Sequence, residues 1–230
     1  MFSNIDWDVI IRSLPYLFLE GMRFTIMLTL IATTGGIVIG TLLALARLSD
    51  VPGLSHVAGA YVNLIRSMPL VLVIFWFFFL VPYIGQWLTG ASRPIQVGAF
   101  LSALVTFTLF EAAYFCEIMR AGIQSIPRGQ IQAAQALGMS YWTAMGEIIL
   151  PQAFRNMVPV LLTQTIILFQ DTSLVYVISV TDFLGAASKV AQRDGRLVEM
   201  YLFAAIVYFV VSFAASYGVR RLQQRIAINR

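Results

Sequence analysis

The sequence predicts an all-α membrane protein with about five transmembrane helices. Hydrophobic residues make up 59% of the 230 residues and charged residues only 11%, with a mean hydropathy of +0.82. A soluble domain usually contains about 25% charged residues. Long charge-free runs divide the chain, and a helix of about 20 mostly apolar residues can cross the hydrocarbon core. We therefore interpret residues 1–230 as a single transmembrane domain.

The first twenty residues predict an N-terminal helix and no cleavable signal peptide. They contain three acidic side chains and lack a basic leader. Trp7, Ile10, Ile11 and Leu14 recur at helical spacing. Two interpretations of residues 1–20 remain open: a short amphipathic helix in the membrane interface, or a first turn packed on the helix bundle.

The charge-free runs place the spans. We predict them at residues 22–47, 57–84, 95–120, 153–180 and 197–219. The third and fourth are long enough only if their helices continue through Glu111 and Asp171 respectively. An odd number of spans puts the two termini on opposite faces of the membrane. The basic cluster RRLQQRIAINR directly follows the last span, so the positive-inside rule predicts a cytoplasmic C-terminus and a periplasmic N-terminus.

Three reactive residue types occur only once in the sequence, and this argues against several kinds of chemistry. Cys116 is the only cysteine and His56 the only histidine, which excludes an internal disulfide and a zinc cluster of thiolates. Lys189, the only lysine, lacks the glycines of a phosphate loop, so we expect no ATP hydrolysis and no bound cofactor. An intramembrane enzyme would be left with Asp171 and Asp182, which lack a convincing pairing. The net charge of +4 indicates orientation and lipid contact, not nucleic-acid binding.

The stretch IQAAQALGMSYWTAMGEIILP is less apolar than its surroundings. Small residues lead to Gly138, which can take a positive φ and end a helix. A second helix follows, with Trp142, Met145 and Ile149 on one face, and Pro151 suits the first turn of a new helix. The pattern predicts a helical hairpin at the inner face that fits a cleft in a partner. An interfacial hairpin without a partner is the alternative.

The same stretch resembles the loop signature of the membrane subunits of binding-protein-dependent ABC importers, whose type I permease fold has a cytoplasmic coupling helix. The signature begins Glu-Ala-Ala, whereas this chain has Gln132, so a salt bridge from that position is lost. A literal Glu-Ala-Ala begins at Glu111, but it lies within the third span. The resemblance implies a coupling loop at residues 124–151 that docks on an ATPase subunit. It implies contacts by Gln132, Ala133, Ala134, Leu137, Gly138, Ile148, Leu150 and Pro151.

Four further stretches extend the resemblance over nearly the whole chain. They are YVNLIRSMPLVLVIFW, FEAAYFCEIMRAGIQSIPRGQIQAAQALGMS, IILPQAFRNMVP and LFQDTSLVYVISVTDF. They are similar to the polar amino-acid branch of these permeases, and most similar to glutamate/aspartate permease subunits. The resemblance implies a bacterial inner-membrane complex with a second permease subunit, identical or different, and a periplasmic substrate-binding protein. Two ATPase subunits would use ATP and magnesium.

Polar side chains at membrane depth mark candidate positions on a substrate path. Ionisable groups there are costly and usually belong to a pair or a path. Glu117 and Arg120 stand three residues apart and can neutralise each other on one helix face. Structural pairing or snorkelling at helix ends is the alternative. Arg66 and Ser67 precede Pro69, where a broken helix would line a cavity.

The stretch QDTSL interrupts the fourth span. Asp171, Thr172 and Ser173 either cap a short helix that continues to Val180, or open toward the path. On the path, Asp171 would hold the ammonium group that every amino acid carries, and Gln164 would add neutral hydrogen bonds. The candidate path residues are Arg66, Ser67, Glu111, Glu117, Arg120, Gln164, Asp171, Thr172 and Ser173.

The function predicted from the sequence is that of a permease subunit of an ATP-driven glutamate/aspartate importer. Glutamine or another polar amino acid is the alternative cargo. A passive channel is the alternative outside this class, and it would need no docking hairpin at the inner face.

Overall fold

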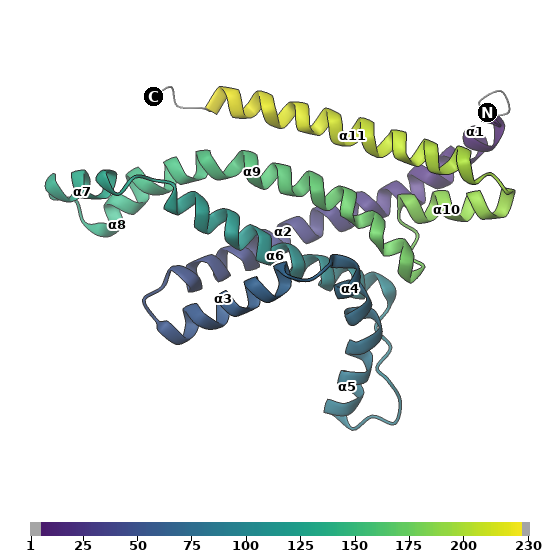
Figure 1. Cartoon of the computed structure of the whole chain (residues 1–230), viewed down its shortest axis with the longest axis horizontal. Coiled ribbons are helices and arrows are strands. Elements are labelled where there is room, and N and C mark those ends of the chain that lie inside the picture. The colour runs from purple at the N-terminus through teal and green to yellow at the C-terminus, as the bar shows by residue number, and fades with distance from the viewer. Residues whose placement is uncertain (1–5, 227–230) are drawn as a thin grey trace.

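The computed structural model describes residues 6–226, in which helices pack side by side and no strand occurs (Figure 1). In chain order the elements are α1 (Trp7–Tyr16), η1 (Leu17–Met22), α2 (Arg23–Leu48), α3 (Pro52–Arg66), α4 (Leu70–Phe75), η2 (Trp76–Leu80), α5 (Val81–Thr89), α6 (Ala99–Gln124), α7 (Arg128–Ala136), α8 (Tyr141–Ala144), η3 (Met145–Ile149), α9 (Leu150–Asp171), η4 (Thr172–Ile178), α10 (Phe183–Asp194) and α11 (Leu197–Ile226). Within the described residues, 5 helices are long and apolar enough to cross a membrane. The predicted all-α membrane fold is confirmed.

The N-terminal segment is part of the first long helix. α1, η1 and α2 form one helix of 42 residues, Trp7–Leu48, so of the two interpretations the structure favours a first turn packed on the bundle over a separate surface helix. The physical reason is that its buried face, which includes Val9 and Ile10, packs with α10 and α11. Asp6 caps this helix by accepting hydrogen bonds from the backbone of Asp8 and Val9. Residues 1–5 of the predicted segment lie outside the described part.

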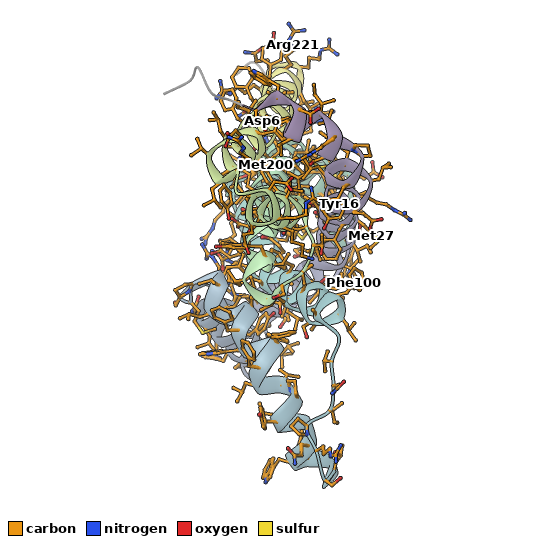
Figure 2. The ribbon with its side chains drawn as sticks, turned by 90° about the vertical axis from the view of Figure 1, so that its right-hand side faces the viewer. Asp6, Tyr16, Met27, Phe100, Met200 and Arg221 are labelled. Atoms are coloured by element: carbon orange, nitrogen blue, oxygen red, sulfur yellow. The ribbon has the colours of Figure 1, made fainter. Side chains whose placement is uncertain are left out.

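The single span predicted at residues 57–84 is interrupted. α3 ends at Arg66, and the next helix begins only after Pro69, whose backbone is extended with ψ 131°. Proline has no N–H to donate to the preceding turn, so the helix breaks at this point. α3 lies beside α2 and α6, whereas α5 extends away from the other helices in both views (Figures 1 and 2).

Small residues allow α2 and α6 to approach closely. A Cβ on Gly40 would lie 2.9 Å from the Ala112 carbonyl oxygen, and one on Gly36 would lie 3.0 Å from the Phe115 ring. Only glycine fits positions where the helix backbone meets a neighbour this closely. The α2–α6 contact therefore fixes the position of α6, which carries Glu111 and Glu117.

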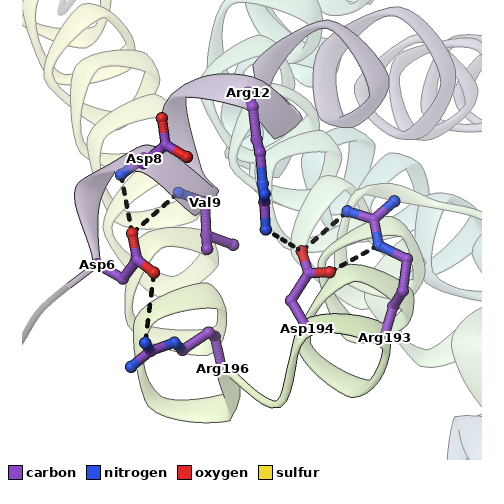
Figure 3. Close-up of polar contacts among 7 residues, drawn as sticks. All are labelled: Asp6, Asp8, Val9, Arg12, Arg193, Asp194 and Arg196. Carbon is purple, nitrogen blue, oxygen red and sulfur yellow. Dashed lines mark hydrogen bonds and ion pairs between the residues drawn. The ribbon is translucent and has the colours of Figure 1, made fainter.

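A second packed region lies at the end of the molecule where α1, α10 and α11 meet. Figure 3 shows Asp194, at the end of α10, accepting hydrogen bonds from Arg12 and Arg193, while Arg196 reaches Asp6. The hydrogen bond and charge of Arg193, with the charge of Arg12, lower the pKa of Asp194 to about 2. These ion pairs connect the start of the first helix to the end of α10 and to the turn between α10 and α11.

The chain leaves α6 at one end of the molecule and forms a hairpin. α7 ends at Ala136, and Gly138, two residues later, has the φ of 76° of the predicted left-handed turn. The following helix does not end at Pro151, contrary to prediction, because α8, η3, α9 and η4 form one helix, Tyr141–Ile178. Pro151 occupies its tolerated place in the first turn of α9, after the wide turn of η3. The C-terminal end of α11 lies toward the hairpin's end of the molecule and α1 lies at the opposite end (Figure 1).

Candidate functional site

A carboxylate surrounded by three guanidinium groups lies where α2, α3 and α6 meet. Glu117 accepts hydrogen bonds from Arg47 and from Arg120, whose Nη2 donates to Oε2 at 2.7 Å. The Arg66 Nη1 atom lies 3.8 Å from Glu117 Oε2. We call these four residues the Glu117 cluster. The predicted pairing of Glu117 with Arg120 is confirmed, and Arg66 belongs to the same group.

A cavity of about 440 Å³ adjoins this cluster, between α6 and α9. Arg66 and Glu117 contribute its charged lining, and Ser125 and Asn156 contribute polar atoms. The Asn156 amide donates to Ser125 Oγ at 2.9 Å. Apolar side chains such as Met157 complete the wall. The cavity can therefore hold a small molecule with both a charged and an alkyl part.

A second group of polar side chains, around the acidic residues Glu111 and Asp171, lies nearer the start of α6 than the Glu117 cluster. Glu111 is fully buried, with 0% of its surface exposed, and the Gln164 amide donates to its two carboxylate oxygens at 3.1 and 3.3 Å. Asp171 stands seven residues, about two helical turns, after Gln164, so it lies on the same side of α9. The Arg66 Cζ atom lies 5.4 Å from the Tyr114 ring centroid, and Tyr114 stands three residues after Glu111 on α6, so the acidic group and the Glu117 cluster are neighbours. α6 and α9 thus bring together the predicted residues Glu111 and Gln164, with Asp171 on the same side of α9 as Gln164.

The structure shows the hydrogen bonds and burial of four predicted path residues: Ser67, Asp171, Thr172 and Ser173. The side chain of Asp171 makes no capping hydrogen bond, so the capping interpretation is wrong. The helix continues without a new N-terminus, because η4 follows α9 directly. Thr172 is buried and its hydroxyl donates to the Phe169 carbonyl at 2.7 Å. Ser67 likewise donates to the Asn63 carbonyl at 2.7 Å, while Ser173 is partly buried.

The α7–α8 hairpin presents an exposed tip. Leu137 is 82% exposed and Trp142 is 81% exposed, and Gln132, Ala133 and Gly138 are exposed as well. Exposed apolar side chains of this size at a turn are typical of a contact surface. The tip fits the predicted contact role of Gln132, Ala133, Leu137 and Gly138.

The other predicted contact residues lie deeper. Ala134 is only 1% exposed, because its side chain packs inside the hairpin, so its predicted place on the contact surface is wrong. Ile148 is half-buried and packs against the main core, and Leu150 is half-buried at the start of α9. Pro151 is exposed in the first turn of that helix. These residues support the hairpin rather than form its tip.

Two important groups were not recognised from the sequence. Arg47 stands 70 residues from Glu117 along the chain, so no local pattern connects them. Asp182 is buried and caps α10 by accepting hydrogen bonds from the backbone of Leu184 and Gly185. An aspartate three residues before a backbone donor at a helix start is a local capping signal that could have revealed it. Burial raises the pKa of Asp182 to about 6, although these bonds and one from Tyr208 oppose the shift.

Residues 36–228 match the family model of the binding-protein-dependent transport system inner membrane component. The chain belongs to this family. It is therefore a membrane component of a transport system and not itself an enzyme. The resemblance seen in the loop signature is confirmed, and the α7–α8 hairpin lies within the matched region.

Known relatives cover almost the whole chain. It is 54% identical over 224 residues to the glutamate/aspartate import permease protein GltK of Escherichia coli O6:H1. The alignment covers 97% of this chain and 99% of that relative. It is 32% identical over 225 residues to the glutamine transport system permease protein GlnP of Escherichia coli K12, spanning 98% and 99%.

Solved structures share the fold. A chain from the crystal structure of an amino acid ABC transporter with histidines superimposes with a TM-score of 0.87 at 30% identity, covering 97% of this chain and 100% of that chain. A chain of the MetNI methionine ABC transporter in an inward facing conformation gives a TM-score of 0.72 at 18% identity, covering 94% and 98%. The latter likeness concerns the fold alone.

Proposed function

We propose that the chain is a permease subunit of an ATP-driven importer of L-glutamate and L-aspartate. The similarity to the glutamate/aspartate import permease GltK, 54% identical over 97% of this chain, carries the proposal. Glutamine or another polar amino acid is the alternative cargo, supported by the more distant similarity to GlnP at 32% identity.

The proposed complex has several subunits. This chain pairs with a second permease subunit, a copy or a different chain, and a periplasmic binding protein delivers the amino acid. Two ATPase subunits on the cytoplasmic side bind ATP with magnesium. The proposed topology has a periplasmic N-terminus and a cytoplasmic C-terminus. It is supported by the basic residues at the C-terminal end of α11 and by the position of the hairpin at that same end of the molecule (Figure 1).

The acidic group gives the path its proposed chemistry. Asp171, which is only partly buried, would contact the α-ammonium group that every amino acid carries, and the fully buried Glu111 would attract it from a distance. Their charge would repel the carboxylates of an acidic cargo, so the ammonium group must face them. Gln164, already bonded to Glu111, holds that carboxylate in place. Hydrogen bonds to charged groups contribute about 1.5–3 kcal/mol, enough to orient the cargo.

The exposed hairpin tip gives the proposed coupling. Ala133, Leu137 and Gly138 would insert into a cleft of the ATPase subunit. A rigid hairpin continuous with a 38-residue helix, Tyr141–Ile178, would transmit movement of the ATPase to the path. A passive channel would have no use for such a contact.

The test is reconstitution in vesicles with the ATPase subunit, the second permease and the binding protein. We expect uptake of radiolabelled glutamate that requires ATP and is inhibited by aspartate more strongly than by glutamine. The purified chain alone should hydrolyse no ATP. Uptake that proceeds without ATP would point to a channel, and stronger inhibition by glutamine would assign the alternative cargo.

A further inference from the structure

The charges of the Glu117 cluster do not balance. Three guanidinium groups, from Arg47, Arg66 and Arg120, surround the single carboxylate of Glu117. Glu117 and Arg120 belong to a helix long and apolar enough to cross a membrane, and Arg47 belongs to another. Arg47 lies in the last turn of α2 and Arg120 lies four residues before the end of α6, so the excess positive charge is near one end of both helices and can attract an anion.

Two of the guanidinium groups have capacity for a further acceptor. The Arg120 Nε atom is buried and has no hydrogen-bond partner among the described residues. Arg66 approaches Glu117 only to 3.8 Å, beyond hydrogen-bond distance, and its Cζ lies 5.4 Å from the Tyr114 ring centroid. A buried donor without a partner is unusual and calls for an explanation such as an unseen ligand.

We propose that the Glu117 cluster binds a carboxylate group of the transported amino acid, with Arg66 as the principal donor. The proposal rests on the proposed function and adds a second position to the path, beyond the acidic group at Glu111 and Asp171. Arginine presents planar, paired N–H donors that match a carboxylate. The cargo would thus meet carboxylates that attract its ammonium group, and then guanidinium groups that attract its carboxylate.

The surroundings of Arg66 support this assignment. Arg66 is the cluster member that both lines the 440 Å³ cavity and keeps 41% of its side chain exposed. Tyr114 connects the two groups, since its ring lies 5.4 Å from the Arg66 Cζ atom and it shares a face of α6 with Glu111, three residues earlier. Apolar residues such as Ile118 and Val160 in the cavity wall suit the methylene groups of the cargo.

The probe is glutarate, which carries two carboxylates and no ammonium group, so the acidic residues should repel it. Binding is measured by calorimetry on the purified permease–ATPase complex without nucleotide. We expect the wild type to bind glutarate and Arg66→Gln to bind it about tenfold more weakly, a loss of about 1.4 kcal/mol. Arg66→Lys keeps the charge but not the paired donors, so its affinity should fall between these two.

Arg221→Gln is the matched control, because Arg221 lies on the exposed end of α11 and contacts Tyr217. It should bind glutarate like the wild type. No glutarate binding by the wild type, or equal binding by Arg66→Gln, would overturn the proposal. ATP-driven glutamate uptake by the same wild-type complex separates the two failures: its absence contradicts the proposed function, whereas uptake without glutarate binding contradicts only this inference.

A lipid phosphate is the other oxyanion that could occupy the cluster. The calorimetry is therefore repeated in bilayer discs of phosphatidylcholine, with and without phosphatidylglycerol. The proposal predicts the same glutarate affinity in both. If phosphatidylglycerol abolishes glutarate binding by the wild type, the cluster is a lipid headgroup site and the proposal is wrong.

Discussion

Among single residues, Asp171 allows the sharpest test of the proposed path. Its side chain caps no helix, so replacing the carboxylate by an amide removes a charge without removing a structural hydrogen bond. A charge-assisted hydrogen bond is roughly twice as strong as a neutral one. We expect Asp171→Asn to reduce glutamate uptake at low substrate by about tenfold, as measured by initial rates in vesicles.

The control for this prediction is Asp50→Asn, the same chemical change at an exposed loop position. It should transport like the wild type. Equal uptake by Asp171→Asn and wild type would remove Asp171 from the path.

Asp182 gives a prediction about pH. Its pKa in the folded protein is raised from 3.8 to about 6 by burial, so the folded state binds the proton more tightly than the unfolded state. Stability from this group is therefore present at low pH and is lost as pH rises from about 4 to about 6. Over this range the free energy of unfolding falls by about 3 kcal/mol. Tyr208 is the titratable group that donates to it.

Asparagine caps a helix about as well as aspartate and does not ionise. We expect Asp182→Asn to be more stable than wild type at pH 7 and similar at pH 4. Thermal denaturation in detergent at a series of pH values measures this difference. A constant difference across the series would show that the Asp182 carboxyl does not titrate in this range.

At the scale of elements, the α7–α8 hairpin combines local and tertiary determinants. Gly138 comes two residues after the end of α7 and has the positive φ that a glycine at this position predicts. The burial of Ala134 was not predictable, since Ala133, Ala134 and Ala136 have the same side chain and only the packing of α8 and η3 against α7 distinguishes them. Whether Pro151 starts a helix or lies inside one depends on η3, whose wide turn has no clear sequence signal.

Gly138→Val should uncouple transport from ATP hydrolysis. A β-branched residue tolerates a φ of 76° poorly, and the strain costs about 1–3 kcal/mol. We expect loss of ATPase pull-down and of glutamate uptake, while membrane insertion continues. Gly90→Val is the strain-matched control, because Gly90 also has positive φ, 65°, but follows α5.

Ala133→Arg tests the same contact without backbone strain. Ala133 is exposed, so the long side chain is tolerated in the free permease, but it would not enter a cleft shaped for a methyl group. We expect the same loss of pull-down and uptake. Normal coupling in both variants would leave the hairpin without a docking role.

For the whole molecule, the spans were predictable and the interactions between them were not. Charge-free runs reveal apolar helices directly, and Pro69 gives the position of the break after α3. The Glu117 cluster joins residues from α2, α3 and α6, and such long-range pairs leave no local pattern. The chain around Glu111 likewise gives no sign that Gln164 lies opposite it.

The topology is tested with reporters at two positions. We expect a reporter fused after Arg230 to be cytoplasmic and a tag within residues 86–93, next to the turn at Gly90, to be accessible from outside. Alkylation of the tag by a membrane-impermeant reagent measures the second. Labelling of both positions from one side would show that the number of crossings is not five.

The wide turn η1 in the first helix determines the rotational phase between its two ends. Arg12 before η1 reaches Asp194, and Arg47 after it reaches Glu117, so each arginine must face its own partner. One residue of an α-helix corresponds to about 100° of rotation. Deleting the exposed Glu20 would therefore turn Arg12 away from Asp194 while leaving Arg47 in place. Cysteine cross-linking between positions 12 and 194 should then fail, and its persistence would show that the helix rewinds elsewhere.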